Sequence, residues 1–361
     1  MNSRRSFLRD AGLLVAGLPL ALRAASPTKN QRVGVCLVGL GSYSTNNLAP
    51  ALELTEHCHL TGIVTGSPEK IPVWQAKYRV PDRNVYSYTT FSEMANNPAI
   101  DVAYIVLPTG LHAKYSILAA EAGKHVWCEK PMALTTRECQ AMIDACRRNA
   151  VTLTIGYRMQ HEPNTRRFME WARTQPYGKL RTIRAEVGYR MTPNFKSWRW
   201  QRELSGSGPL YDLGVYSVNA LRYAAQEEPI AIRATHTTQR KEQFRDIPEI
   251  TEFTLEFPSG LVGHGKHTSA ETVNLLRVDC ERGWYQLSPF QTYGGISGET
   301  SDGKRFSDAV RNQQAKQMDN DALAILNGTD VLVPGNDGLR DIALLEAIER
   351  SVARGERVSL A

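Results

Sequence analysis

The chain has 361 residues, a net charge of +6 and 22% charged side chains. This length is sufficient for two domains, and the 42% of apolar residues is typical of a globular protein with a sizeable core. Lysine and arginine are scattered and do not alternate with aromatic residues in a basic block, so the composition argues against a nucleic-acid-binding protein.

An export leader is predicted at the start of the chain. Arg4 and Arg5 precede an apolar segment over residues 11–22, and small residues follow that segment. This order predicts a twin-arginine signal over residues 1–25, cleaved near residues 24–26, with the twin-arginine export machinery as a partner and a periplasmic mature protein. The apolar segment is shorter than the ~20 residues of a spanning helix, so we expect no membrane span in the mature chain. The alternative is an ordinary N-terminal helix with a chance arginine pair.

The six cysteines, at positions 36, 58, 128, 139, 146 and 280, do not form a metal-binding pattern. No Cys-x-x-Cys pair occurs, and no histidines lie at the spacing of a zinc site, so we expect no metal. Cys36 and Cys128 lie inside apolar runs and are interpreted as core residues. Disulfide pairing after export stays open.

A nucleotide-binding pattern opens the mature chain. Residues 32–41 form a buried-strand run that ends in a glycine turn, and helical periodicity follows over 46–54. The turn has the first two glycines of the dinucleotide fingerprint, with Ser44 in place of the third. Such a turn lets the backbone approach a pyrophosphate at a helix N-terminus. The cofactor contacts expected here are Gly39, Leu40, Gly41, Ser42 and Tyr43.

The next strand, over residues 60–65, ends where NAD-specific sites place an acidic residue for the ribose 2′-hydroxyl. This chain has Thr65, Gly66 and Ser67 there, followed by Lys70. Hydroxyl groups and a lysine suit a 2′-phosphate, which a carboxylate would repel. The pattern therefore favours NADP over NAD; the alternative is that Lys70 is only a solvated helix residue.

Strands and helices continue to alternate up to residue 155. Strands are predicted over 102–106, 125–128 and 151–155, with a helix that ends at residue 122 and another over 135–149. This alternation predicts an α/β fold, with a doubly wound Rossmann domain over residues 26–155. The loop after the 102–106 strand should border the nicotinamide through Leu107, Pro108 and His112.

Glu129, Lys130 and Pro131 follow the 125–128 strand directly. At the carboxyl edge of a parallel sheet, a lysine in this position faces whatever binds above the strands. The alternative is a surface lysine beside a turn proline.

The second half, over residues 156–361, has a different sequence pattern. Five stretches alternate or carry β-branched residues, at 180–189, 230–238, 250–257, 261–267 and 275–280. They predict a C-terminal α+β domain with a large, mostly antiparallel sheet, packed on helices over 211–224, 318–326 and 338–354. We expect the two domains to share a tight interface and a cleft.

A glycine-rich turn over residues 206–208 leads into a helical pattern that contains Asp212 and Tyr216. Four residues apart, the two side chains lie on one face of a helix. A tyrosine near a lysine can act as general acid or base, because a neighbouring cation stabilises the phenolate. Read alone, Tyr216 is more often a packed core tyrosine.

The motifs together resemble the glucose–fructose oxidoreductase and inositol dehydrogenase (Gfo/Idh/MocA) family over essentially the whole mature chain. The likeness to exported glucose–fructose oxidoreductases is particularly close. It rests on the Gly39 turn, Glu129-Lys130-Pro131 and the Asp212-x-x-x-Tyr216 segment, together with residues 65–70, 155–158, 198–200 and 312–313.

The resemblance implies catalytic roles for four residues. Lys130 would orient the sugar and lower the pKa of Tyr216, Tyr216 would exchange the proton, Asp212 would position the sugar, and Glu129 would help to hold Lys130. The Lys130–Pro131 peptide is often cis in this family. The resemblance extends the cofactor contacts to Tyr88, Glu129, Lys130 and Arg158, and makes Arg158, Arg199 and Trp200 sugar-side contacts, unless the arginines are ordinary ion-pair partners.

The implied activity is NADP-dependent hydride transfer between sugars, in which one aldose reduces a bound nucleotide and a second sugar reoxidises it. Exported relatives carry a long proline-rich arm, whereas only residues 26–31 precede the first strand here, which puts permanent NADP retention in doubt. A homo-oligomer is expected from the family. The alternatives are a simple NAD(P)-dependent sugar or polyol dehydrogenase, an anhydrosugar reductase, an NAD-dependent glycoside hydrolase, and a sugar or nucleotide sensor without catalysis.

Overall fold

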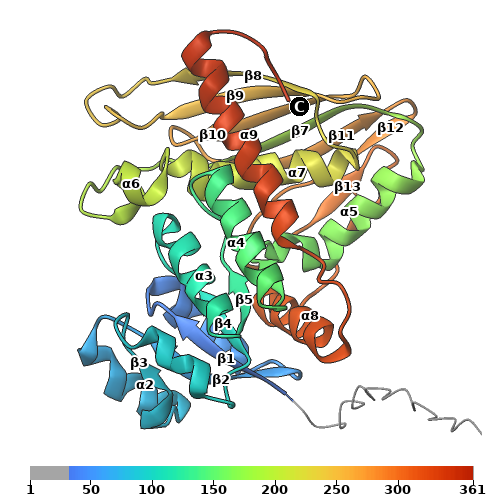
Figure 1. Cartoon of the computed structure of the whole chain (residues 1–361). Helices are drawn as coiled ribbons and strands as arrows, with labels where there is room; N and C mark the ends of the chain where they lie inside the picture. The colour runs from blue at the N-terminus through green and yellow to red at the C-terminus, as the bar shows by residue number, and fades with distance from the viewer. Residues whose placement is uncertain (1–31, 361) are drawn as a thin grey trace, which may run out of the picture. The chain divides into compact units, whose positions relative to one another are not determined.

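The computed structural model describes residues 32–360 of the chain (Figure 1). The predicted leader over residues 1–25, with its arginine pair and cleavage region, lies outside the described residues. Between residues 32 and 360, no helix is both long enough and apolar enough to cross a membrane.

The first half contains a six-stranded parallel sheet, as the alternation of strands and helices predicts. Its order is β3-β2-β1-β4-β5-β6, so the order reverses between β1 and β4. Ligands of open α/β sheets bind outside the carboxyl ends of the strands at such a reversal. The loops after β1 and β4 are therefore placed to border a cofactor. The strands are β1 (Val33–Val38), β2 (Cys58–Val64), β3 (Val85–Tyr86), β4 (Val102–Ile105), β5 (His125–Cys128) and β6 (Leu153–Ile155).

Helices cover both faces of the parallel sheet (Figure 1). On one face lie α3 (His112–Glu121) and α4 (Thr136–Arg148), and on the other lie α1 (Ala49–Leu52) and α8 (Gln313–Asn327). All six residues of β1 are consequently buried. Coverage on both faces explains why these strands read as continuous apolar runs. The helix α8 belongs to the last part of the chain but completes the core of the first half.

The second half contains a nine-stranded sheet in the order β14-β13-β12-β11-β7-β10-β9-β8-β15. All of its pairings are antiparallel except that of β7 with β10. The prediction of a mostly antiparallel sheet is confirmed. The strands are β7 (Leu180–Gly188), β8 (Ala231–Thr237), β9 (Ile250–Glu256), β10 (Val262–Thr268), β11 (Val273–Cys280), β12 (Gly283–Leu287), β13 (Gly298–Thr300), β14 (Arg305–Phe306) and β15 (Val358–Ser359).

Two helices pack between the halves. The helix α7 (Val215–Ala225) contacts β7 and β10, and α9 (Gly335–Arg354) contacts β8, β6 and α4. The described residues accordingly form one compact unit, in agreement with the predicted tight interface. The predicted cleft between the halves stays a prediction.

Several helix boundaries differ from those predicted. The first helix was expected over 46–54, but the chain becomes helical earlier, in a π-helical turn over Ser44–Leu48. The α4 boundary agrees, because Thr135 and Glu138 form a reciprocal capping box. Two helices were missed, α2 (Ile71–Tyr78) and α5 (Pro163–Thr174). In α2 only Trp74 is buried, so no apolar stripe marks it.

The remaining helical segments are short. They are α6 (Arg202–Ser205), the π-helical turn η8 (Leu210–Gly214), and the 3₁₀ turns Pro68–Lys70, Asp82–Asn84, Phe91–Asn96, Thr109–Leu111, Arg158–His161 and Trp198–Trp200. All six cysteines are free. In the described part of the chain, no three His, Cys, Asp or Glu side chains gather as a metal site would require.

Candidate active site

Lys130 lies at the carboxyl end of β5, where its ammonium group meets the second half of the molecule. Its Nζ donates to the main-chain oxygen of Asp212 at 2.6 Å and lies 3.3 Å from Asp212 Oδ1. The Lys130–Pro131 peptide is cis, as the resemblance implied. Burial disfavours the charge on Lys130, but Tyr216 and Asp212 outweigh burial and raise its pKa. Lys130 therefore stays a cation at neutral pH.

Asp212 is shared between Lys130 and Arg199. Arg199 Nε donates to Asp212 Oδ2 at 2.9 Å, so each carboxylate oxygen faces one cation. Burial would raise the pKa of Asp212, and the two cations more than offset it, so the pKa is lowered. Asp212 lies in the π-helical turn η8 rather than in the regular helix predicted over 211–224, which begins only at Val215.

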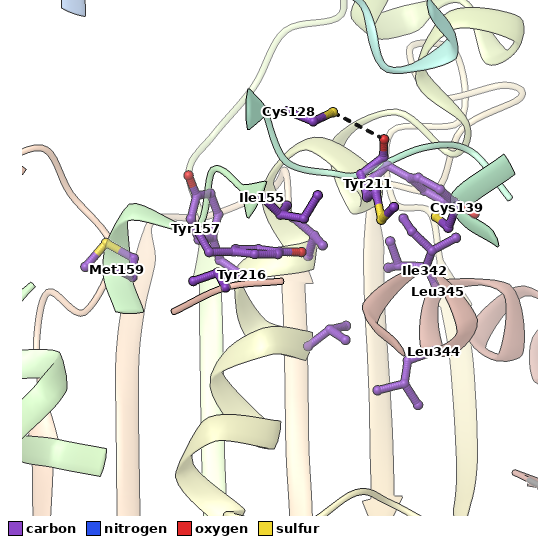
Figure 2. Packing of buried hydrophobic residues seen from close by; sticks show 14 of the residues in the cluster. Cys128, Cys139, Ile155, Tyr157, Met159, Tyr211, Tyr216, Ile342, Leu344 and Leu345 are labelled. Carbon is purple, nitrogen blue, oxygen red and sulfur yellow. Dashed lines mark hydrogen bonds between the residues drawn. The ribbon is translucent and has the colours of Figure 1, made fainter. Parts of the chain in front are cut away.

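Tyr216 lies in the first turn of α7, beside Lys130. The Lys130 ammonium is 4.7 Å from the centre of the Tyr216 ring, and the Arg158 guanidinium is 5.5 Å from it. The tyrosine is 7% exposed and belongs to the same buried cluster as Tyr157 and Ile155 at the end of β6 (Figure 2). The predicted pairing of Lys130 with Tyr216 across the two halves is thus present, with the cation over the ring.

Glu129 supports Lys130 through its charge, and its direct hydrogen bond goes to another residue. It forms no ion pair with Lys130 within 4 Å; instead its Oε1 accepts a hydrogen bond from the Tyr104 hydroxyl at 2.7 Å. Gly156 covers the carboxylate, because a Cβ added there would lie 2.7 Å from Oε1. Burial raises the pKa of Glu129, and the Tyr104 hydrogen bond and Lys130 oppose that rise. Glu129 is a buried carboxyl beneath the site.

The predicted cofactor loops come together at the carboxyl ends of β1 and β2. Gly39 has φ +96°, and a side chain there would collide with the Val106 main-chain oxygen at 2.6 Å. An added Cβ at Gly41 meets nothing within 4 Å, which leaves the close approach that a pyrophosphate needs. Ser44, in place of the third glycine, donates to the Gly39 carbonyl at 2.6 Å and fixes the turn.

The residues predicted to bind the ribose end of the cofactor also lie close to the glycine turn. Lys70 Nζ donates to the Leu40 main-chain oxygen at 2.9 Å, which brings this lysine onto the glycine turn. Thr65 Oγ1 accepts from the Ser67 N–H at 3.0 Å. The Tyr88 ring lies against Gly66, where an added Cβ would be 3.0 Å from it. These residues fit an NADP cofactor, because Lys70 offers a cation, and Thr65 and Ser67 offer hydroxyl groups, after β2 where the ribose of a dinucleotide is expected.

His112 is the first residue of α3 and contacts the loop that is predicted to border the nicotinamide; its own contact with the cofactor stays a prediction. It is 1% exposed, with Nδ1 2.9 Å from the Pro131 carbonyl and Nε2 2.8 Å from the Leu107 carbonyl. Burial lowers its pKa despite these contacts. His112 therefore joins the loop after β4 to the Lys130–Pro131 segment, and we interpret it as a positioning residue.

Comparison with known proteins agrees with this geometry. Residues 33–157 match the oxidoreductase family with the NAD-binding Rossmann fold, GFO_IDH_MocA, and residues 165–286 match the GFO/IDH/MocA C-terminal domain. The chain belongs to the Gfo/Idh/MocA oxidoreductase family.

Three relatives of this Gfo/Idh/MocA protein illustrate the similarity. The aldose–aldose oxidoreductase of Caulobacter crescentus, crystallised with glycerol, is 35% identical over 91% of this chain and 100% of that chain, with a TM-score of 0.88. The NADP-dependent D-xylose 1-dehydrogenase of Haloarcula marismortui is 31% identical over 63% of both chains, so the match spans less than two thirds of that relative. A levoglucosan dehydrogenase in complex with NADH and levoglucosan shares the fold, with a TM-score of 0.79 at 19% identity.

The remaining predicted residues differ in how close they lie to Lys130. Arg158 is 1% exposed and lies over Tyr216, whereas Arg199 reaches Asp212 from a half-exposed position. Trp200 instead packs with the Phe195 and Phe244 rings, at 6.4 and 5.6 Å between centres. No hydrogen bond in the described residues ties it to Lys130, Asp212 or Tyr216, and its sugar contact stays a prediction.

Two residues near the site were missed from the sequence. Tyr104 interrupts an otherwise apolar strand, and a polar hydroxyl in such a run is a signal that could have been used. Tyr293 lies in the loop between β12 and β13, and its ring centre is 4.7 Å from the Arg158 guanidinium. Nothing local in the sequence marks Tyr293, because its partners are far away along the chain.

Proposed function

We propose that this protein is an NADP-dependent sugar oxidoreductase that transfers hydride between a sugar carbon and the nicotinamide. The observation that carries the proposal is the convergence of Lys130, Asp212 and Tyr216 at the carboxyl edge of the parallel sheet. The likeness to an aldose–aldose oxidoreductase and to an NADP-dependent D-xylose dehydrogenase supports a sugar as the substrate. The full complement of these residues argues against a non-catalytic sensor.

In this proposal, the side chains handle the proton while the nicotinamide, when bound, accepts or returns the hydride. Oxidation of a sugar CH–OH group breaks the C–H bond and the O–H bond and forms a carbonyl. Tyr216 takes the hydroxyl proton and returns it in the reverse direction. Lys130, held by Asp212, places its ammonium group beside that oxygen and stabilises the negative charge that develops there.

We propose NADP as the cofactor, and Lys70 is the residue that supports this choice. Its ammonium lies on the glycine turn, and Thr65, Gly66 and Ser67 bring no carboxylate to the ribose. A 2′-phosphate gains from the cation, whereas an NAD-specific site would present an acid to the 2′-hydroxyl.

Within this function, we further propose that two sugars react in turn and recycle the bound nucleotide. One aldose would reduce the bound nucleotide and leave as the oxidised product, and a second sugar would then reoxidise the nucleotide. The twin-arginine pattern supports this version, because folded export lets a cofactor loaded in the cytoplasm reach the periplasm, where we propose the protein acts. We also propose a homo-oligomer, in line with the family expectation.

The test uses the purified mature protein without added nucleotide. Absorbance and fluorescence of the nicotinamide should change when an aldose is added and return when a second sugar follows. A protein that is purified free of cofactor and turns over aldoses only with added NADP would refute the recycling version and retain the dehydrogenase. A panel of polyols, anhydrosugars and p-nitrophenyl glycosides separates the alternatives, since only a glycoside hydrolase releases nitrophenol.

A further inference from the structure

Tyr43 and Tyr293 connect the cofactor turn of the first half to a loop of the second half. Their ring centres are 6.1 Å apart, with 29° between the ring planes. Tyr43 follows the glycine turn after β1, and Tyr293 lies in the loop between β12 and β13. The contact therefore bridges the two halves at the end of the sheet where the dinucleotide is expected to bind.

Arg158 lies against the same bridge and has unused hydrogen-bonding capacity. Its guanidinium is 4.7 Å from the centre of the Tyr293 ring and 5.5 Å from that of Tyr216. The side chain is 1% exposed, yet Nε and Nη2 have no hydrogen-bond partner. A buried cation with free N–H groups is costly unless a ligand satisfies it. The phosphate and carboxamide oxygens of a dinucleotide are suitable acceptors.

The backbone that follows Tyr293 is exposed and loosely packed. Tyr293 is 57% exposed, and Gly294 and Gly295 follow it directly. An added Cβ at either glycine would meet nothing within 4 Å, so packing does not fix the backbone there. Gly295 also has φ +72°, a conformation that glycine adopts without strain. The Tyr293 ring therefore precedes two glycines whose Cβ positions face open space.

We propose that Tyr43, Arg158 and Tyr293 form a clasp that closes over the bound dinucleotide, with Tyr293 as its moving part. Arg158 binds an oxygen of the cofactor, and the Tyr293 ring holds the guanidinium through a cation–π contact. Tyr293 must leave Tyr43 before the cofactor dissociates, so Tyr293 sets the dissociation rate. The inference rests on the proposed function, because it assumes that a nicotinamide dinucleotide is the ligand of this edge of the sheet.

The test measures how fast NADPH leaves the mature protein, by stopped-flow fluorescence with excess NADP as the chase. Tyr293→Ala should release NADPH at least tenfold faster than wild type, whereas Tyr293→Phe should stay within about twofold because it keeps the ring. Tyr189→Ala is the matched control, since Tyr189 is similarly exposed, at 54%, and should leave the rate unchanged. In Tyr43→Ala, the further change to Tyr293→Ala should accelerate release less than it does in the wild type, because the stacking partner is already absent and only the contact with Arg158 is lost.

A wild-type dissociation rate in Tyr293→Ala, with the thermal melting temperature retained, would overturn the clasp. Equal acceleration in Tyr293→Phe and Tyr293→Ala would also overturn it, since the ring would then not matter. The proposed function can fail independently of the clasp. If the wild type binds NADPH but none of the tested sugars exchanges hydride with it, the proposed activity is refuted, and the dissociation rates still test the clasp.

Discussion

Tyr104 of β4 and Glu129, the residue that follows β5, form a buried pair, with the Tyr104 hydroxyl 2.7 Å from Glu129 Oε1. Gly156 closes the other side of the carboxylate. Gln317 of α8 in turn lies 3.4 Å from the Tyr104 hydroxyl. The residue next to Lys130 is thus fixed by three segments, one of them near the end of the chain.

Tyr104→Phe removes that hydrogen bond and keeps the ring. The Tyr104 hydroxyl opposes the rise in the pKa of Glu129 that burial causes, so its loss raises this pKa further. Protonated Glu129 no longer supports the charge on Lys130, which Glu129 helps to maintain. We expect the acid limb of the pH–activity profile to move to higher pH, and stability to fall by about 1–3 kcal/mol.

The matched control for this change is Tyr285→Phe, which removes a buried hydroxyl that has no partner. It should leave the pH profile in place. If Tyr104→Phe loses stability but keeps the wild-type acid limb, the pair is structural only. Glu129→Gln removes the titrating carboxyl. It should therefore lack the acid limb that Glu129 causes, both in the wild type and in Tyr104→Phe.

Lys130→Met and Tyr216→Phe should each reduce kcat by at least a hundredfold, because each removes a group assigned to the reacting oxygen. Asp212→Asn should be milder. The shorter contact of Lys130, at 2.6 Å, is with the main-chain oxygen of residue 212, which the substitution leaves intact. Steady-state rates, measured alongside thermal melts, check the ranking. Wild-type turnover in both Lys130→Met and Tyr216→Phe would show that the site assignment is wrong.

The sequence predicted the parts of the site that follow from strand ends. Buried strands are continuous apolar runs, so the positions of Gly39, Leu107 and Lys130 at the carboxyl edge of the sheet could be read directly. The order of elements also implied that these ends lie side by side. Tyr216 could be linked to Lys130 only through the family resemblance, since no local pattern brings two distant segments together.

The sequence did not predict contacts that depend on side-chain direction. His112 is the first residue of α3, directly after the expected loop, and its ring turns inward to two carbonyl groups, one of them in Pro131. Glu129 turns to Tyr104 rather than to Lys130, because the Gly156 segment leaves room for it there. Such choices are set by packing between segments, and periodicity contains no information about them.

Lys70→Glu tests the choice of cofactor. The substitution replaces a cation on the glycine turn with an anion, which should weaken NADPH binding at least tenfold by repulsion of the 2′-phosphate, and leave NADH binding within about threefold. Fluorescence titration of both nucleotides gives the two dissociation constants. Lys77→Glu, the same change at an exposed position of α2, is the control. Equal loss for NADPH and NADH would mean that Lys70 supports the turn and does not read the phosphate.

Asp321 in α8 predicts an unusual pH dependence of stability. Its side chain is 1% exposed, and burial raises its pKa from 3.8 to about 8, with Thr154 and Gln317 opposing the rise. Below about pH 4 the carboxyl is protonated in both the folded and the unfolded chain, so it does not make stability depend on pH. Between about pH 4 and pH 8 only the unfolded chain ionises, so the free energy of unfolding falls as pH rises, by up to ~1.4 kcal/mol per unit.

Asp321→Asn should remove this slope. We expect its melting temperature relative to wild type to increase steadily from pH 5 to pH 8 and then to level off, because above pH 8 the wild-type carboxyl is ionised in both states. Asp330→Asn, at an exposed position, should track the wild type throughout. Parallel curves for wild type and Asp321→Asn across this range would mean that Asp321 is ionised in the folded protein, and that an unrecognised partner of its Oδ2 atom holds the charge.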